Sequence, residues 1–198
     1  MPMPELPSDL SRLSLADIAQ LAADQRLPPV DQWSPTKFGH SEMRIARDAS
    51  WYHQGDPIRR ETMVRLFSTI LRRDADGRHY LVTPVEKLEI DVDDTPFLAV
   101  EVKSEGESDT RTLAFRLNTG DLILAGPDHP LRLTELDGDL IPVLSVRGGM
   151  EARIARPVYY ALADWAITEA HDPIGLWSSG MFFPLGGQCD YLPVCARR

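Results

Sequence analysis

The chain has 198 residues, of which 43% are hydrophobic and 26% charged, so it can bury the core of one domain or of two small ones. Lys and Arg total 21 against 30 Asp and Glu, and the formal net charge of −9 disfavours binding to duplex nucleic acid, although it permits a local basic cleft. No apolar run is long enough to span a bilayer, and residues 1–9 lack the basic and apolar regions of a signal peptide, so we expect a cytoplasmic protein without a membrane span.

The N-terminal segment predicts a short helix followed by a proline-rich linker. Ser14 can cap a helix whose apolar residues recur on one face, and this pattern ends near Leu27. Pro28 and Pro29 then favour extended backbone, because proline fixes φ and lacks a backbone N–H. We assign residues 1–29 to an N-terminal helix and linker.

Residues 30–88 predict a small α+β domain. Segments 43–47 and 50–53 have the composition of two strands around a turn. Apolar residues at helical spacing then predict a helix over residues 60–72, with arginines on its polar face.

Residues 89–170 predict a partly closed antiparallel barrel capped by a helix. Short apolar segments separated by turn signals recur from residue 80 onward. The expected strands are 80–83, 87–92, 97–103, 112–117, 122–125, 131–136 and 141–146. A helix with Pro157 in its first turn follows, and about six or seven curved strands with a helix at the open end are typical of a barrel. Residues 171–198 are expected to form a packed tail.

A repeat at an offset of 96 residues connects the two halves of the chain. Ile58-Arg59-Arg60 before the helix expected over 60–72 resembles Ile154-Ala155-Arg156 before the helix that contains Pro157. Apolar positions within the two helices also match. Coincidence and duplication explain the apolar matches about equally well. The shared Ile-x-Arg favours duplication of a strand-turn-helix unit.

The arginines near the two helix starts are the main candidates for binding a ligand. A helix start favours an anion because its backbone N–H groups point outward, and arginine suits bidentate recognition of phosphate or carboxylate. Arg60 and Arg156 hold matching positions, and Arg147 and Arg153 precede the second helix. The alternative is that Arg60 and Arg156 form salt bridges between the units, with Glu86, Glu151 or Asp94 as partners.

Two residues before the helix expected over 60–72 each have two alternative roles. Trp51 can stack on a nucleotide base, or it can pack in the core beside the end of a strand. His53 can bind a ligand, or it can hydrogen-bond to a backbone carbonyl.

No catalytic or metal-binding motif stands out in the sequence. The five histidines include no pair at metal-ligand spacing, and Cys189 and Cys195 have no histidine nearby. The segment from Gly126 to His129 places Asp128 beside an imidazole, but its composition is mainly that of a turn. We therefore expect no catalytic residue, no metal and no cofactor, and an enzyme is the less favoured class.

Several ordered motifs resemble the bacterial DUF1285 family. They include Trp51-Tyr-His53-Gln-Gly55-Asp-Pro57-Ile58-Arg-Arg60, Tyr80-Leu-Val-Thr-Pro84-Val-Glu86-Lys87, Asp94-Thr-Pro96-Phe97 and Arg147-Gly-Gly-Met-Glu151-Ala-Arg153. The resemblance covers residues 35–168 and implies a two-domain α+β protein built by duplication, with a C-terminal half similar to a pleckstrin-homology-like (PH-like) barrel. It also implies a nucleotide-like ligand where the domains meet, and a role in signalling.

The sequence thus predicts a non-catalytic ligand-binding or signalling module that holds a small anionic, nucleotide-like molecule in a cleft between the domains. The candidate ligand-binding residues are Trp51, His53, Arg60, Lys87, Arg147, Arg153, Arg156 and Tyr159. One alternative is a module that binds a protein or peptide in a PH-like groove along Val158 and Leu162. A second alternative is a hydrolase that uses His53 or His129.

Overall fold

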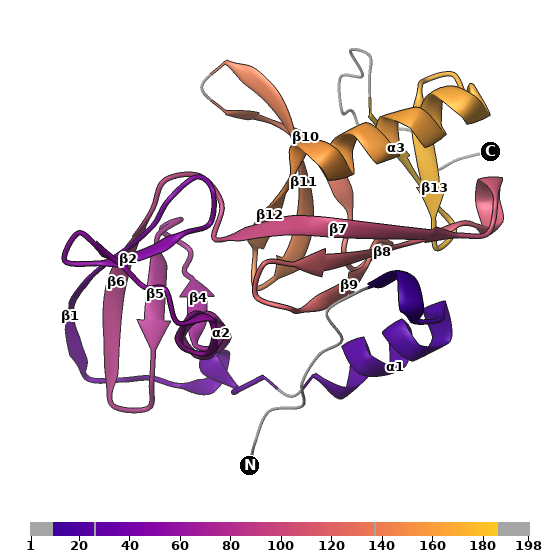
Figure 1. Ribbon diagram of the computed structural model, residues 1–198. Coiled ribbons are helices and arrows are strands. Elements are labelled where there is room, and N and C mark those ends of the chain that lie inside the picture. Colours follow the sequence, from indigo (N-terminus) through magenta and orange to yellow (C-terminus); the bar gives the residue numbers. More distant parts are fainter. Residues whose placement is uncertain (1–9, 26, 137, 186–198) are drawn as a thin grey trace.

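The computed structural model describes residues 10–25, 27–136 and 138–185. Within these residues the chain forms two six-stranded sheets, three α-helices and a two-stranded hairpin (Figure 1). The mixed α+β class expected from the sequence is confirmed. None of the helices in the described part of the chain has the length and apolar character needed to cross a membrane.

The first sheet and one helix form what we call the first unit. Its elements are β1 (Lys37–Ile45), β2 (Trp51–His53), β3 (Asp56–Pro57), α2 (Glu61–Thr69), β4 (Leu71–Arg73), β5 (His79–Val82) and β6 (Glu86–Val92). The strand order is β3-β2-β1-β6-β5-β4, and the central pair of β1 and β6 is parallel.

The second sheet and the longest helix form the second unit. Its elements are β7 (Phe97–Glu105), the 3₁₀ turn η3 (Ser108–Thr110), β8 (Thr112–Leu117), β9 (Leu122–Leu124), β10 (Leu131–Leu136), β11 (Asp139–Arg147), β12 (Met150–Ile154) and α3 (Arg156–Glu169). The strand order is β10-β11-β12-β7-β8-β9, again with a parallel pair, β7 and β12, at the centre. A hairpin of β13 (Gly175–Ser178) and β14 (Met181–Pro184) follows α3.

The two sheets share one strand order. When the strands of each sheet are numbered from its own first strand, the first sheet reads 3-2-1-6-5-4 from β3 to β4. The second sheet reads the same when it is followed from β9 to β10. The helices do not correspond in the same way, since α2 lies between the third and fourth strands and α3 follows the sixth. The 96-residue repeat therefore pairs two helices that hold different places in their units.

Several expected elements differ from those in the structure because strands pair over long distances. The expected antiparallel meander over residues 80–146 is wrong: β5 and β6 belong to the first sheet, where β6 pairs with β1. The expected domain boundary after residue 88 accordingly falls within β6. The expected helix over 60–72 ends at Thr69, because β4 pairs with β5.

Several strands were absent from the sequence-based expectation, including three in the C-terminal part of the chain. Residues 150–154 form β12, which joins β11 to β7. Within the expected tail, residues 175–184 contain the hairpin of β13 and β14, whereas residues 186–198 lie outside the described part of the chain.

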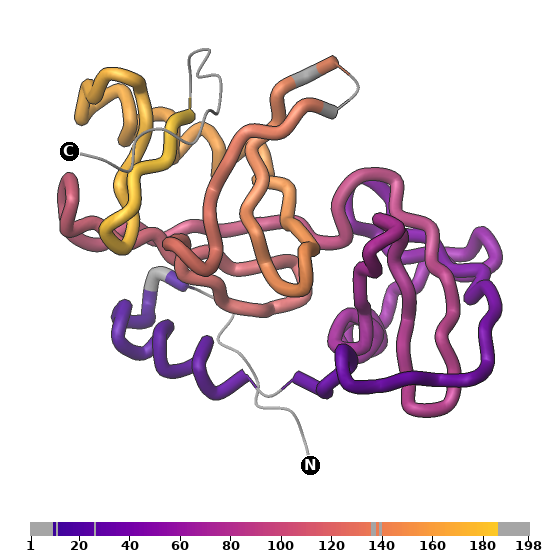
Figure 2. Tube along the Cα trace, turned by 180° about the vertical axis from the view of Figure 1, so that it is seen from behind, coloured from indigo at the N-terminus to yellow at the C-terminus, as the bar shows by residue number. Residues whose placement is uncertain are grey.

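The N-terminal helix α1 (Leu15–Asp24) packs on the second unit, beside β9 (Figures 1 and 2). Ser14 caps it as expected, through a reciprocal capping box with Asp17. Ile18 is fully buried in a small cluster with Leu122 of β9. The 3₁₀ turns η1 (Leu10–Arg12) and η2 (Val30–Gln32) flank α1, and the linker after α1 runs from the second unit to the first (Figure 2).

One hydrophobic core is continuous through both units. The same cluster contains Ile45 and Leu71 of the first sheet and Phe97 and Phe115 of the second, and all four are fully buried. This continuity holds the two units in a fixed arrangement around the segment that joins β6 to β7.

Candidate functional site

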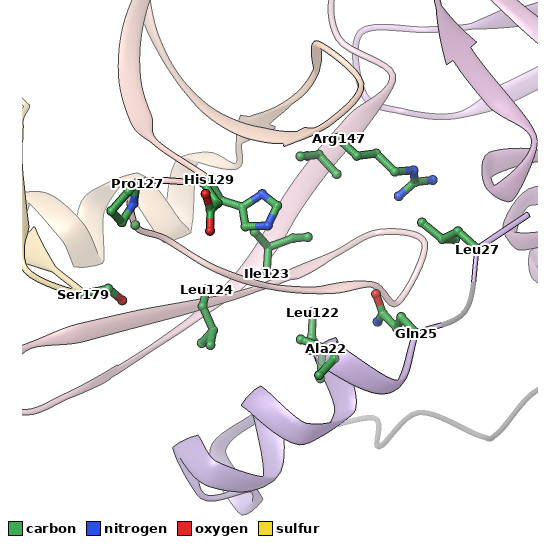
Figure 3. Close-up of a pocket in the computed structure, with 14 residues that line it drawn as sticks. Ala22, Gln25, Leu27, Leu122, Ile123, Leu124, Pro127, His129, Arg147 and Ser179 are labelled. Atoms are coloured by element: carbon green, nitrogen blue, oxygen red, sulfur yellow. The ribbon is translucent and has the colours of Figure 1, made fainter. Parts of the chain in front are cut away.

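A pocket of about 450 Å³ lies between α1 and the second sheet (Figure 3). Its walls come from the end of α1, from β9, from the turn before β10 and from the end of β11. They are formed by Ala22, Ala23, Gln25, Leu27, Leu122, Ile123, Leu124, Gly126, Pro127, Asp128, His129, Val146, Arg147 and Ser179. Pockets of this size commonly bind small molecules.

The apolar wall of the pocket results from the alternation of side chains along β9. Leu122 belongs to the small cluster beneath α1, whereas Ile123 belongs to the main core. Successive residues of a strand face opposite sides, so this short strand joins both clusters. The small side chains of Ala22 and Ala23 at the end of α1 leave room for the pocket between this helix and β9.

A tight turn positions the imidazole of His129 in the pocket. Two backbone hydrogen bonds between Gly126 and His129, of 3.1 and 3.2 Å, close this turn. His129 Nδ1 lies 3.2 Å from the carbonyl oxygen of Ser145. When Nδ1 donates to that carbonyl, Nε2 of the neutral ring is an acceptor.

Gln25 supplies a second polar group from the opposite wall. Its Nε2 atom is buried and has no hydrogen-bond partner among the described residues. Buried polar atoms in native proteins nearly always have a partner, so this amide is suited to donate to an acceptor that occupies the pocket.

Arg147 joins the two units at the edge of the pocket. Its Nη2 donates to the carbonyl oxygen of Ser68 at the end of α2 at 2.8 Å, and its Nη1 lies 3.3 Å from a carboxylate oxygen of Asp121 in the second unit. The guanidinium also lies 5.0 Å from the centre of the Phe97 ring. One cation thus contacts both units.

A second cavity of about 120 Å³ continues from Arg147 into the junction of the two units. Its walls include Leu71 and Arg72 of the first unit and Met150 of the second. Both cavities are lined by Leu27 and Arg147, and we call the two together the Arg147 groove. Arg147 is the one predicted ligand-binding residue that lines the described cavities.

Trp51 and His53 lie in different surroundings although both belong to β2. Trp51 is 2% exposed, and its ring stacks on Phe67 with 6.3 Å between ring centres. Of its two alternatives, the structure therefore places Trp51 in the core, where its face is covered. His53 is exposed near the edge of the first sheet.

Arg60 and Arg156 lie at helix starts, as expected from the sequence. Arg60 is the N-cap of α2 and Arg156 the first residue of α3, and both are exposed. Neither side chain forms an ion pair within the described residues, so the expected salt bridges with Glu86, Glu151 or Asp94 are absent there. A ligand-binding role for these two arginines stays a prediction.

Three further candidates have protein partners. Lys87 pairs with Asp74, and its Nζ lies 3.8 Å from the centre of the Tyr80 ring. Arg153 pairs with Asp94, whose side chain is 1% exposed. The hydroxyl of Tyr159 donates to the carbonyl oxygen of Leu185 at 3.5 Å. These contacts give all three residues a structural role.

The described residues contain no group of three or more potential metal ligands. Among the histidines, His129 lines the groove. His79 lies in β5, where burial and the charge of Arg73 lower its pKa to about 4. The groove is lined by one imidazole, one amide, the guanidiniums of Arg147 and Arg72, and the carboxylates of Asp31 and Asp128. Arg72 already pairs with Asp74, so Arg147 is the group best suited to bind an anion.

No sequence pattern points to Gln25 or Asp121 as site residues. Gln25 follows a helix outside the motifs of the resemblance, and its place in the groove depends on how α1 docks on β9. Asp121 follows a glycine turn, and its link to Arg147 spans 26 residues. His129 had a partial signal, since its Gly-Pro turn was recognised and His129 was a candidate in the hydrolase alternative.

Comparison with known proteins places this geometry in a family. Residues 28–95 match the domain described as "Domain of unknown function (DUF1285), N-terminal domain", and residues 96–185 match "Protein of unknown function (DUF1285), C-terminal domain". No curated protein matches the chain.

Two crystal structures are similar to this chain. One is a DUF1285 family protein from Silicibacter pomeroyi DSS-3, with 45% identity and a TM-score of 0.74, over 84% of this chain and 93% of that one. The other, a DUF1285 family protein from Shewanella baltica OS155, has 23% identity and a TM-score of 0.49, over 62% of this chain and 90% of that one. The two matched domains and the 45% identity lead to one conclusion: the chain belongs to the DUF1285 family.

Proposed function

We propose that the protein is a non-catalytic module that binds a small anionic, nucleotide-like ligand in the Arg147 groove. The observation that carries the proposal is the position of Arg147, which borders both cavities and contacts both units. A ligand held there would lie at the junction of the two units, a position that suits a role in signalling.

The groups around Arg147 suit an anion with a flat apolar part. The guanidinium can donate charge-assisted hydrogen bonds to a phosphate or carboxylate in addition to Asp121. The amide of Gln25 can donate a further hydrogen bond, His129 Nε2 can accept one from a hydroxyl or N–H of the ligand, and Leu122 and Leu124 supply apolar walls. Apolar walls with a few convergent polar groups are the usual composition of a small-molecule site.

A thermal-shift screen of nucleotides and dinucleotides tests this proposal. A ligand at about 100 times its dissociation constant stabilises the folded state by about 2.7 kcal/mol. For a ligand found in this way, we expect Arg147→Gln to weaken binding by about tenfold or more, because one charge-assisted hydrogen bond is lost. Asp121→Asn is expected to strengthen binding, because it removes the carboxylate that competes for Arg147.

Arg116→Gln is the matched control for Arg147→Gln. Arg116 also pairs with a carboxylate of the second unit, Glu101 at 2.7 Å, but it lines neither cavity of the groove. Equal losses of affinity in the two variants, or a screen in which no anionic ligand raises the melting temperature, would contradict the proposal.

The proposal includes two more detailed features that the family resemblance implied. We propose that the second unit is PH-like, since six strands are followed by a helix, and that the units arose by duplication, since their sheets share one strand order. The parallel pairing of β7 with β12 departs from a purely antiparallel barrel. We also propose that the protein acts in the cytoplasm.

A second candidate function is binding of a protein partner by α3. Val158 and Leu162, which were expected to line a groove, are buried at 4% and 0% exposed, so they cannot form it. Tyr160 and Ile167, at 68% and 66% exposed, lie seven residues apart and hence on one face of α3. A Tyr160→Ser/Ile167→Ser variant that keeps the fold and still binds every partner recovered with the wild type would exclude this surface.

A further inference from the structure

A second pocket, of about 410 Å³, lies at the C-terminal end of α3 and shares no lining residue with the Arg147 groove. It is lined in part by Arg111, Trp165, Glu169 and His171. These residues come from the segment between β7 and β8, from the last turns of α3 and from the start of the connection to β13, which meet at one edge of the second unit (Figure 1).

Arg111 and Glu169 form an ion pair that is largely removed from solvent. Their side chains are 8% and 15% exposed. The guanidinium lies 5.7 Å from the centre of the Trp165 ring, and the backbone N–H of Ser108 donates to Glu169 Oε1 at 3.4 Å. The two charges are therefore held in place by the surrounding chain.

Part of this ion pair has no partner within the described residues. Arg111 Nε and Nη1 and Glu169 Oε2 are buried without a hydrogen bond. His171 Nε2 lies 3.3 Å from Glu169 Oε2, but the two atoms lack the alignment of a hydrogen bond. Because buried polar groups in native proteins are nearly always satisfied, these atoms call for partners from outside the described residues, such as a ligand or water.

The charges of the pocket select among the classes of ligand. A simple anion would be attracted by Arg111 but repelled by Glu169 and Glu107, and a simple cation would be attracted by Glu169 but repelled by Arg111. A molecule with both charges can pair its carboxylate with Arg111 and its ammonium group with Glu169. The C-terminal end of α3 adds a negative potential that favours the ammonium group.

We propose that this pocket binds a small zwitterion that carries a carboxylate and a protonated amine, as an amino acid does. Arg111 donates to the carboxylate through its free N–H groups, and Glu169 accepts from the amine. Trp165 and His171 form the walls beside them. This site is independent of the Arg147 groove.

Isothermal titration of the full chain with the amino acids tests the proposal, with acetate and methylamine as probes that carry one charge each. We expect at least one amino acid to bind about tenfold or more tightly than either single-charge probe, since each probe leaves one charge of the pocket unpaired. In Glu169→Gln we expect weaker binding of that amino acid and stronger binding of acetate, because the variant keeps the shape but removes the negative charge.

A double variant keeps the test valid if Glu169→Gln does not fold. Replacement of a buried ion pair by apolar residues of similar size is often tolerated, so Arg111→Met/Glu169→Leu is expected to fold and to lose binding. The control is Glu151→Gln, which removes the partner of Arg132 outside the pocket and should leave the affinity unchanged. Failure of every amino acid to bind the wild type, unchanged affinity in the double variant, or acetate binding as tight as that of any amino acid would overturn the assignment.

Discussion

Three arginines that are all ligand-binding candidates in the sequence have different roles because their surroundings differ. Arg153 pairs with the buried carboxylate of Asp94, and its backbone N–H donates to the hydroxyl of Thr95 at 3.1 Å. Arg147 bridges two units through Ser68 and Asp121. Arg156, only three residues after Arg153, is exposed. Composition and spacing could not separate these three roles, since each depends on a partner distant in the chain.

This difference predicts a large loss of stability in one variant and a small change in its neighbour. Arg153→Ala is expected to lower the free energy of unfolding by about 3–5 kcal/mol, because it leaves Asp94 as an unpaired buried charge. Arg156→Ala is expected to change it by less than about 1 kcal/mol, since the side chain is exposed. Chemical denaturation of both variants measures the difference.

The Arg153→Ala/Asp94→Asn double variant serves as the control for this pair. It removes the stranded charge, so part of the lost stability should return. A large loss in Arg156→Ala would instead assign Arg156 a structural role and remove it from the candidate ligand-binding residues.

At the scale of elements, local sequence signals succeeded where a pattern ended at a cap or turn. The Ser14 cap and the edges of β8 and β10 agree with the residues expected from the sequence. The helix expected over 60–72 was too long, because the apolar residues after Thr69 belong to a strand whose partner is β5. β12 was missed, although Gly148 and Gly149, with φ of +53° and +72°, allow the tight turn that precedes it.

The position of α1 depends on tertiary contacts. This ten-residue helix is too short to be stable alone, and it lies outside both segments that match the family. Besides the cluster around Ile18, it is held through the preceding segment, where the N–H of Leu10 donates to Glu101 at 3.0 Å. Docking of α1 therefore forms one wall of the Arg147 groove.

Ile18→Ala is expected to release α1 before the rest of the fold is affected. Large-to-small changes of a buried isoleucine cost about 2–5 kcal/mol, and a short docked helix can detach as a local unit. Hydrogen exchange should show faster exchange over residues 18–24, with little change in the sheets. The exposed Gln20→Ala is the control, and uniform acceleration throughout the chain would show that α1 is part of the global unfolding unit.

At the scale of the whole molecule, the two units are joined by more than the segment between β6 and β7. The hydrophobic core is continuous through both sheets. Hydrogen bonds between the units add to it, among them those from Arg147 to the carbonyl of Ser68 at 2.8 Å and from Arg73 to the carbonyl of Gly149 at 2.9 Å. Two sheets that share a core in this way are expected to unfold together.

We therefore predict a single cooperative unfolding transition. Tryptophan fluorescence, to which the buried Trp51 of the first unit contributes, and far-ultraviolet circular dichroism should give coincident denaturation curves. The calorimetric and van't Hoff enthalpies should also agree. Two separated transitions would show that the units fold independently and that the shared core contributes little to their coupling.

The sequence by itself determined the fold class, most of the strands, the capped N-terminal helix and the family resemblance. Each of these depends on local patterns, such as caps, turns, side-chain periodicity and ordered motifs. The tertiary structure alone decided which sheet each strand joins, where the cavities lie and which arginines are paired. These features depend on contacts between distant residues, such as Arg147 with Ser68, which are 79 residues apart, and no local pattern specifies such a pair because its geometry arises only when the two units share a core.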